Sequence, residues 1–202
     1  MYLDEQEVIF CQALAITSLL AELSNRDFLK SEYYKNISFA GNNNNLKEIL
    51  EVSGLGNQAT MQMFLYILLV MPKETLSGLN DATISTWGDE LKTKILSFSP
   101  VVTTSYRNES GSDLNSIKYY RHIRNAVSHC KCEYQTENER LYVIFKDENP
   151  KNDKERCEIK MLSSDVGKML ELLQKQIMEY LNKKLWYINF IVYINPNICK
   201  YK

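Results

Sequence analysis

The sequence has few of the residues that mark non-globular chains. Its 202 residues include seven glycines and four prolines, too few for a collagen-like or low-complexity protein. The formal net charge is −1, which excludes a protein that coats nucleic acid through overall positive charge, so any such contact must come from a local patch. With 45% hydrophobic and 24% charged residues, the composition predicts an ordinary globular protein.

Signals for export or membrane insertion are equally scarce. The N-terminus has neither the basic start nor the cleavage site of a secretory signal. The longest apolar runs, Met61–Met71 and Leu185–Ile194, fall short of the roughly 20 residues that cross a bilayer. We therefore expect a cytoplasmic protein that does not interact with a membrane.

The five cysteines give little support for a metal site. An odd number suits free thiols in a reducing cytosol. Cys130 and Cys132 are separated by one residue, whereas zinc knuckles usually have two to four, and no second pair follows. A site made from His129, Cys130, Cys132 and Cys157 is conceivable, but small apolar roles in a helix end and in strands are favoured, so no metal and no cofactor are predicted.

Hydrophobic periodicity predicts a mainly α fold with a small antiparallel β insertion. After residue 129 the spacing of apolar residues changes from helical to alternating, and it becomes helical again at Ser163. Residues 25–45 and 99–112 read as loops. The predicted helices span residues 4–23, 46–52, 58–71, 81–98 and 113–129, with a last one from 163, and the predicted strands span residues 132–136, 141–146 and 157–162.

These elements form one predicted domain over residues 1–184, with the β insertion at about 132–162. The last helix has an apolar stripe of Val166, Met169, Leu173, Ile177 and Leu181, which is expected to face the core. Residues 185–202 form an apolar tail that is expected to pack on the body or on another subunit.

One segment carries candidate chemistry. Between Leu114 and Cys132 there are four basic residues and no acidic one, although charged helix faces usually mix both signs. On a helix, one side gathers Tyr119, Tyr120, Ile123, Ala126, Val127 and Cys130, and the other gathers Lys118, Arg121, His122, Arg124, Asn125, Ser128 and His129. The basic residues Lys118, Arg121, Arg124 and Lys131 form what we call the cationic strip. It fits either a solvated helix face or a phosphate-binding surface.

The residues Arg124-Asn125-Ala-Val-Ser-His129 match the RxxxxH pattern, often with Asn after the Arg, of the HEPN superfamily. The chain resembles a bacterial and plasmid-borne HEPN subgroup in which this motif leads directly into a short β segment. The resemblance implies a helical bundle that forms a homodimer, in which Arg and His of both subunits line a shared cleft, often as a metal-independent endoribonuclease. It also implies roles such as toxin or antiphage effector, with a protein antitoxin as a partner. Lys131 stands where a nucleotidylated toxin branch has Tyr, so that modification is not expected.

Side-chain chemistry suggests how such a site cuts RNA. His129 would transfer protons for attack by the 2′-hydroxyl, Arg124 would bind phosphate oxygens, and Asn125 would contact phosphate or orient His129. Arg121, Lys118, Lys131, His122 and Ser128 are predicted to position RNA. Acid–base catalysis by histidine needs two imidazoles, which a dimer supplies through both copies of His129. His122 is the other candidate for the second imidazole. The alternatives are a non-catalytic HEPN module that binds RNA or a nucleotide, and a dimeric interaction module.

Overall fold

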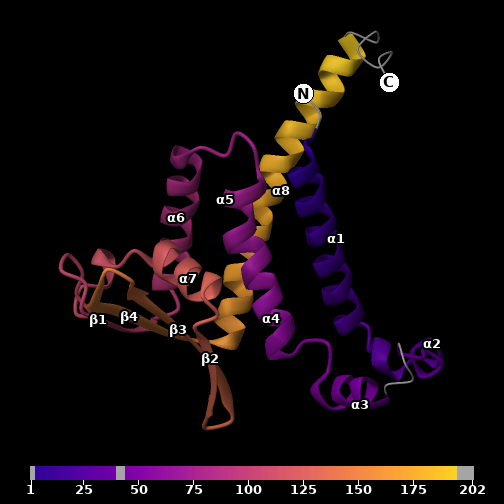
Figure 1. Cartoon of the computed structure of the whole chain (residues 1–202), viewed down its shortest axis with the longest axis horizontal. Helices are drawn as coiled ribbons and strands as arrows, with labels where there is room; N and C mark the ends of the chain where they lie inside the picture. Colours follow the sequence, from indigo (N-terminus) through magenta and orange to yellow (C-terminus); the bar gives the residue numbers. More distant parts are fainter. Residues whose placement is uncertain (1–2, 40–43, 195–202) are drawn as a thin grey trace.

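The computed structural model describes the backbone of residues 3–39 and 44–194 and the side chains of residues 3–39 and 45–184. Long helices form the body, and one sheet lies against its side (Figure 1). This confirms the predicted mainly α fold with an antiparallel β insertion before the last helix. The helices are α1 (Glu5–Asn25), α2 (Glu32–Lys35), α3 (Asn44–Ser53), α4 (Gln58–Leu65), α5 (Met71–Thr75), α6 (Asp81–Leu96), α7 (Tyr119–Ser128) and α8 (Ser163–Ile194), with short turns η1 (Phe28–Lys30), η3 (Tyr66–Val70) and η4 (Leu114–Ser116).

Helix α8 is the longest described helix and runs through the body beside α1 and α4 (Figure 1). All five residues of its predicted stripe are buried. The backbone stays helical to Ile194, so the first ten residues of the predicted tail continue α8. Their side chains and residues 195–202 lie outside the described part of the chain, and the packing of the tail stays a prediction.

Helix α1 begins at the predicted capping box. The Glu7 amide donates to the Asp4 carboxylate at 2.9 Å, and the Asp4 amide donates to the Glu7 carboxylate at 3.2 Å. By length and composition alone α1 could cross a membrane, although 22% of its most apolar window is buried in the protein. Phe10 and Leu14 of α1 pack into the hydrophobic core, while Val8, Ile9, Ile16 and Leu19 leave a second apolar face of the helix exposed.

The helix that was predicted to end before Pro72 continues past it. Segments α4, η3 and α5 follow one another without a break, and η3 is a π-helical turn directly before Met71. Proline lacks an amide donor and crowds the carbonyl four residues earlier. A π-turn at this point widens the helix, which lets it continue with Pro72 in the first turn of α5.

The sheet has four strands, not three. Strands β2 (Cys132–Glu137), β3 (Arg140–Asn149) and β4 (Asn152–Leu162) are the predicted ones, each longer than expected. Strand β1 (Val101–Thr104) was predicted as loop, but it pairs with β4, which gives an antiparallel sheet of order β1-β4-β3-β2. Its sequence, Val-Val-Thr-Thr, does not alternate between apolar and polar residues, and four residues are too few to distinguish a strand from a loop by pattern alone.

Candidate functional site at the end of α7

Helix α7 lies between the sheet and the long helices (Figure 1). It begins at Tyr119, later than the predicted helix start, because Ile117 is extended and buried. Tyr119, Ile123, Ala126 and Val127 are buried as predicted. Cys130, which was placed on the same face, is exposed, since it lies past the end of the helix.

The C-terminus of α7 is a tight turn that feeds directly into β2. The Lys131 amide donates to the Ala126 carbonyl at 2.7 Å, and the Cys130 amide donates to the Val127 carbonyl at 3.2 Å. This pair of bonds defines a Schellman motif. Cys130 adopts a left-handed backbone with φ of 54°, and His129 caps the helix with an exposed side chain. The turn therefore fixes His129 at the junction of helix and sheet.

Replacing Cys130 by glycine is expected to stabilise the protein. A left-handed conformation costs an L-residue roughly 1–2 kcal/mol, while glycine adopts it freely but has a more flexible unfolded chain. The expected net gain in the free energy of unfolding is about 0.5–1 kcal/mol, measured by urea denaturation. Cys130→Ala, which keeps the Cβ, is the matched control and should give no such gain.

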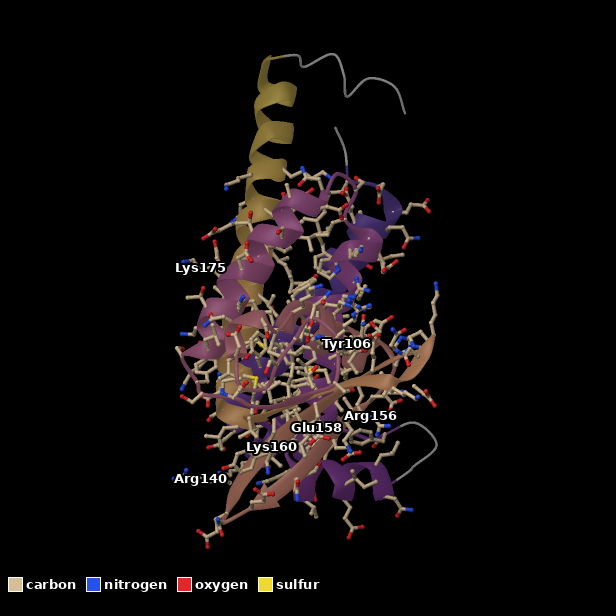
Figure 2. All side chains as sticks on the ribbon, turned by 90° about the vertical axis from the view of Figure 1, so that its left-hand side faces the viewer. Tyr106, Arg140, Arg156, Glu158, Lys160 and Lys175 are labelled. Carbon is tan, nitrogen blue, oxygen red and sulfur yellow. The ribbon has the colours of Figure 1, made fainter. Side chains whose placement is uncertain are left out.

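His129 opens onto a hollow of about 600 Å³, which we call the His129 hollow. Four charged side chains also line it, the basic Lys131 and Arg156 and the acidic Glu148 and Asp153. Arg156 stands beside Glu158 and Lys160 along β4 (Figure 2). The Lys131 ammonium lies 2.5 Å from the Glu148 carboxylate, whose pKa is lowered by that hydrogen bond and by the charge of Lys131. Sequence reasoning missed Arg156 and Glu148, because only the folding of β3 and β4 brings them to the end of α7.

Arg124 precedes His129 by five residues on α7 and is half-buried. Its Nε is buried and has no acceptor among the described residues, and its Nη2 has one long contact, 3.5 Å, with the Asn125 side-chain oxygen. The Ser128 hydroxyl donates to the Arg124 carbonyl at 2.8 Å, so the hydroxyl proton of Ser128 is used in a hydrogen bond within the helix. Among the described residues the Arg124 guanidinium is therefore incompletely paired, and it does not line the His129 hollow.

The cationic strip does not form one continuous surface. Lys118 and Arg121 line a separate groove of about 490 Å³ beside α6, together with Lys92. The Arg121 guanidinium lies over the Tyr106 ring at 5.5 Å from its centroid. Lys131 is the member of the strip that shares the hollow with His129.

His122 was expected on the polar, solvent-facing half of the helix, and this expectation is wrong. Its side chain is 1% exposed. Nδ1 lies 2.6 Å from Asp147 Oδ2, and Nε2 lies 2.8 Å from Glu109 Oε2. The Tyr106 hydroxyl donates to the same Asp147 oxygen at 3.1 Å. His122 therefore ties α7 to β3 and to the 105–113 loop, and it cannot contact RNA in this structure.

Asp147 is an ionised carboxylate inside the protein. Burial acts to raise its pKa, but hydrogen bonds and the charge of His122, with smaller contributions from Tyr106 and Asn125, outweigh it and lower the pKa. The alternation of β3 could have revealed this position, because Val143, Phe145 and Asp147 share the buried face.

A helical body with a small antiparallel sheet, and an RxxxxH motif at the end of a helix that leads into that sheet, define a domain of the HEPN superfamily. The family model described as HEPN pEK499 p136 matches residues 5–184. The chain therefore belongs to the HEPN pEK499 p136 family, which suggests a nucleotide-related or RNase-type function. No curated protein and no solved structure matches the chain.

Proposed function

We propose that the protein is a metal-independent endoribonuclease whose site lies in the His129 hollow and is completed by a second copy of the chain. The observation that carries this proposal is the placement of His129. It is an exposed imidazole, fixed by a Schellman turn and sharing a hollow with two basic side chains, Lys131 and Arg156.

Cleavage of RNA by its own 2′-hydroxyl requires three things. The hydroxyl loses a proton, the leaving 5′-oxygen gains one, and the extra negative charge on the phosphate oxygens is stabilised. His129 can exchange the proton near neutral pH. Arg156 and Lys131 can bind phosphate oxygens, and Arg124 offers a planar set of donors that suits the same oxygens. Asn125, which contacts Arg124, is the residue we propose to position that guanidinium.

The dimer is part of the proposal. One chain supplies a single histidine to the hollow, since His122 is buried away from it, whereas proton removal and proton donation are best served by two imidazoles. A two-fold axis beside the end of α7 would bring both copies of His129 to one phosphate.

The experiment is RNA cleavage by the purified full chain in the presence of EDTA. We expect cleavage within single-stranded RNA, products with 2′,3′-cyclic phosphate ends, and a specific activity that rises with protein concentration as dimers form. Products with 5′-phosphate ends, or cleavage only with added Mg²⁺, would contradict the proposed chemistry.

Binding without cleavage would instead favour the non-catalytic alternative. In that case affinity should fall with increasing salt, because phosphate contacts release counterions. A shift of the monomer–dimer equilibrium without any RNA binding would favour the interaction module.

A further inference from the structure

A second cluster of reactive side chains lies beneath the sheet, apart from the His129 hollow. Glu109 comes from the loop after β1, His122 from α7 and Cys157 from β4, and one ligand atom of each lies within 4.8 Å of the others. The side chains of Glu109 and His122 are 2% and 1% exposed, and Cys157 is 1% exposed. Three segments far apart in the sequence thus meet at one buried point.

We propose that Glu109, His122 and Cys157 form a binding site for a divalent transition-metal ion, with Zn²⁺ the best match. A thiolate, an imidazole nitrogen and a carboxylate oxygen are the ligand types that Zn²⁺ takes in proteins. The hard ions Mg²⁺ and Ca²⁺ prefer oxygen ligands alone. The ion would join α7 to β4 and to the 105–113 loop, and it would lie outside the His129 hollow, which none of the three ligands lines.

Asp147, which contacts the ring nitrogen of His122 that faces away from Glu109, supports this assignment. Histidines that ligate metals usually donate their second ring N–H to a carboxylate, which fixes the tautomer. Here Asp147 Oδ2 lies 2.6 Å from His122 Nδ1. Without an ion, Nε2 lies within hydrogen-bond distance of both Glu109 oxygens, at 3.0 and 2.8 Å. A bound ion would take the place of the proton on Nε2, while Asp147 would keep the proton on Nδ1. Asp147 and Cys157 are direct cross-strand partners in the register of β3 and β4, so the sheet holds ligand and supporting carboxylate together.

The charge and hydrogen-bond balance of the cluster also favours a bound cation. Two carboxylates, Asp147 and Glu109, face a single imidazole in a buried environment, and buried negative charge is unfavourable unless it is paired. The Tyr119 hydroxyl is buried without a hydrogen-bond partner among the described residues. Its pKa is raised to about 12 by burial and, to a smaller extent, by the charges of Cys157 and Glu109.

The residues suggested by the sequence for a metal site do not come together. Among the described residues, Cys157 is the member of that set that joins the cluster, whereas His129 and Cys130 are exposed at the end of α7. The closeness of Cys130 and Cys132 in the sequence therefore does not indicate a metal site, and the cluster forms instead through contacts between residues distant in the sequence.

The test measures Zn²⁺ binding by the full-length, metal-depleted chain in competition with a chromophoric chelator. We expect one Zn²⁺ per chain and a higher unfolding temperature with Zn²⁺ than without it. Cys157→Ser and Glu109→Gln should each weaken binding by at least about tenfold, and Asp147→Asn, which keeps all three ligands, by about 10- to 100-fold. The matched control is Cys132→Ser, a half-buried strand cysteine outside the cluster, and its affinity should be unchanged.

Two results would overturn the proposal: a folded wild-type chain that binds no Zn²⁺, or a Cys157→Ser variant that binds it as tightly as wild type. If the variants fail to fold, Co²⁺ bound to the wild-type chain gives the answer. A sulfur-to-cobalt charge-transfer band would support the assignment, and bound Co²⁺ without that band would refute it. None of these measurements depends on ribonuclease activity.

Discussion

Replacing His129 by alanine is expected to lower the rate of RNA cleavage by about 100- to 10,000-fold, the usual contribution of a proton-transfer group. The fold should stay intact, because the side chain is exposed at the end of α7 and its cap bonds come from the backbone. Binding of RNA should change little, since Lys131 and Arg156 remain. The measurement is a single-turnover cleavage rate, together with a binding isotherm at fixed salt.

Arg124→Ala tests the second half of the motif in the same assay. The control for a lost positive charge is Arg140→Ala. Arg140 is exposed and lies on the β2–β3 hairpin, far from Tyr106 in Figure 2. This variant should cut as fast as wild type. If His129→Ala and Arg124→Ala both cut at the wild-type rate in preparations free of contaminating nuclease, the catalytic assignment is wrong.

Mixing wild-type and His129→Ala subunits tests the composite site. The heterodimer keeps one histidine at the shared cleft. If both imidazoles act on one phosphate, its cleavage rate should be close to that of the His129→Ala homodimer. A rate near half that of the wild-type dimer would show that each chain works alone.

Local patterns in the sequence were sufficient for much of the fold. The capping box at Asp4 and the apolar stripe of α8 are properties of consecutive turns, and both are present in the structure. Strand β1 and the helix through Pro72 were missed, because each depends on a partner distant in sequence or on a π-turn that no single residue announces.

The candidate site likewise combines residues that local sequence patterns place with residues that only the folded chain brings together. The motif itself could be read from spacing, and so could the position of His129 at a helix end. The burial of His122 could not be predicted, because helical spacing places it beside polar residues. Its partners in the interior are Asp147, 25 positions later, and Glu109, 13 positions earlier. Arg156 joins the His129 hollow through the register of β3 and β4, which local periodicity does not determine.

His122→Ala is expected to destabilise the protein by about 3–5 kcal/mol, because removing one partner of a buried charge cluster leaves Asp147 and Glu109 without their shared donor. In a chain of this length that corresponds to a fall in unfolding temperature of roughly 6–20 °C. The measurement is chemical and thermal denaturation in a chelating buffer, so that it reports the hydrogen bonds and not a bound metal. His129→Ala is the matched control, and loss of this exposed histidine should change the free energy of unfolding by less than about 1 kcal/mol.

The pH dependence separates this explanation from a simple packing defect. In the wild-type protein the pKa of Asp147 is lowered by its hydrogen bonds, so the stability that Asp147 provides is present at neutral pH and is lost as the pH falls through its folded-state pKa. In His122→Ala the main hydrogen bond is absent, and burial should raise the pKa of the same carboxyl above its value in the unfolded chain. Lowering the pH then neutralises the buried Asp147 carboxylate and raises the free energy of unfolding of the variant. The difference in stability between the two proteins should therefore shrink as the pH is lowered, whereas a cavity left by the imidazole would produce a difference that stays constant with pH.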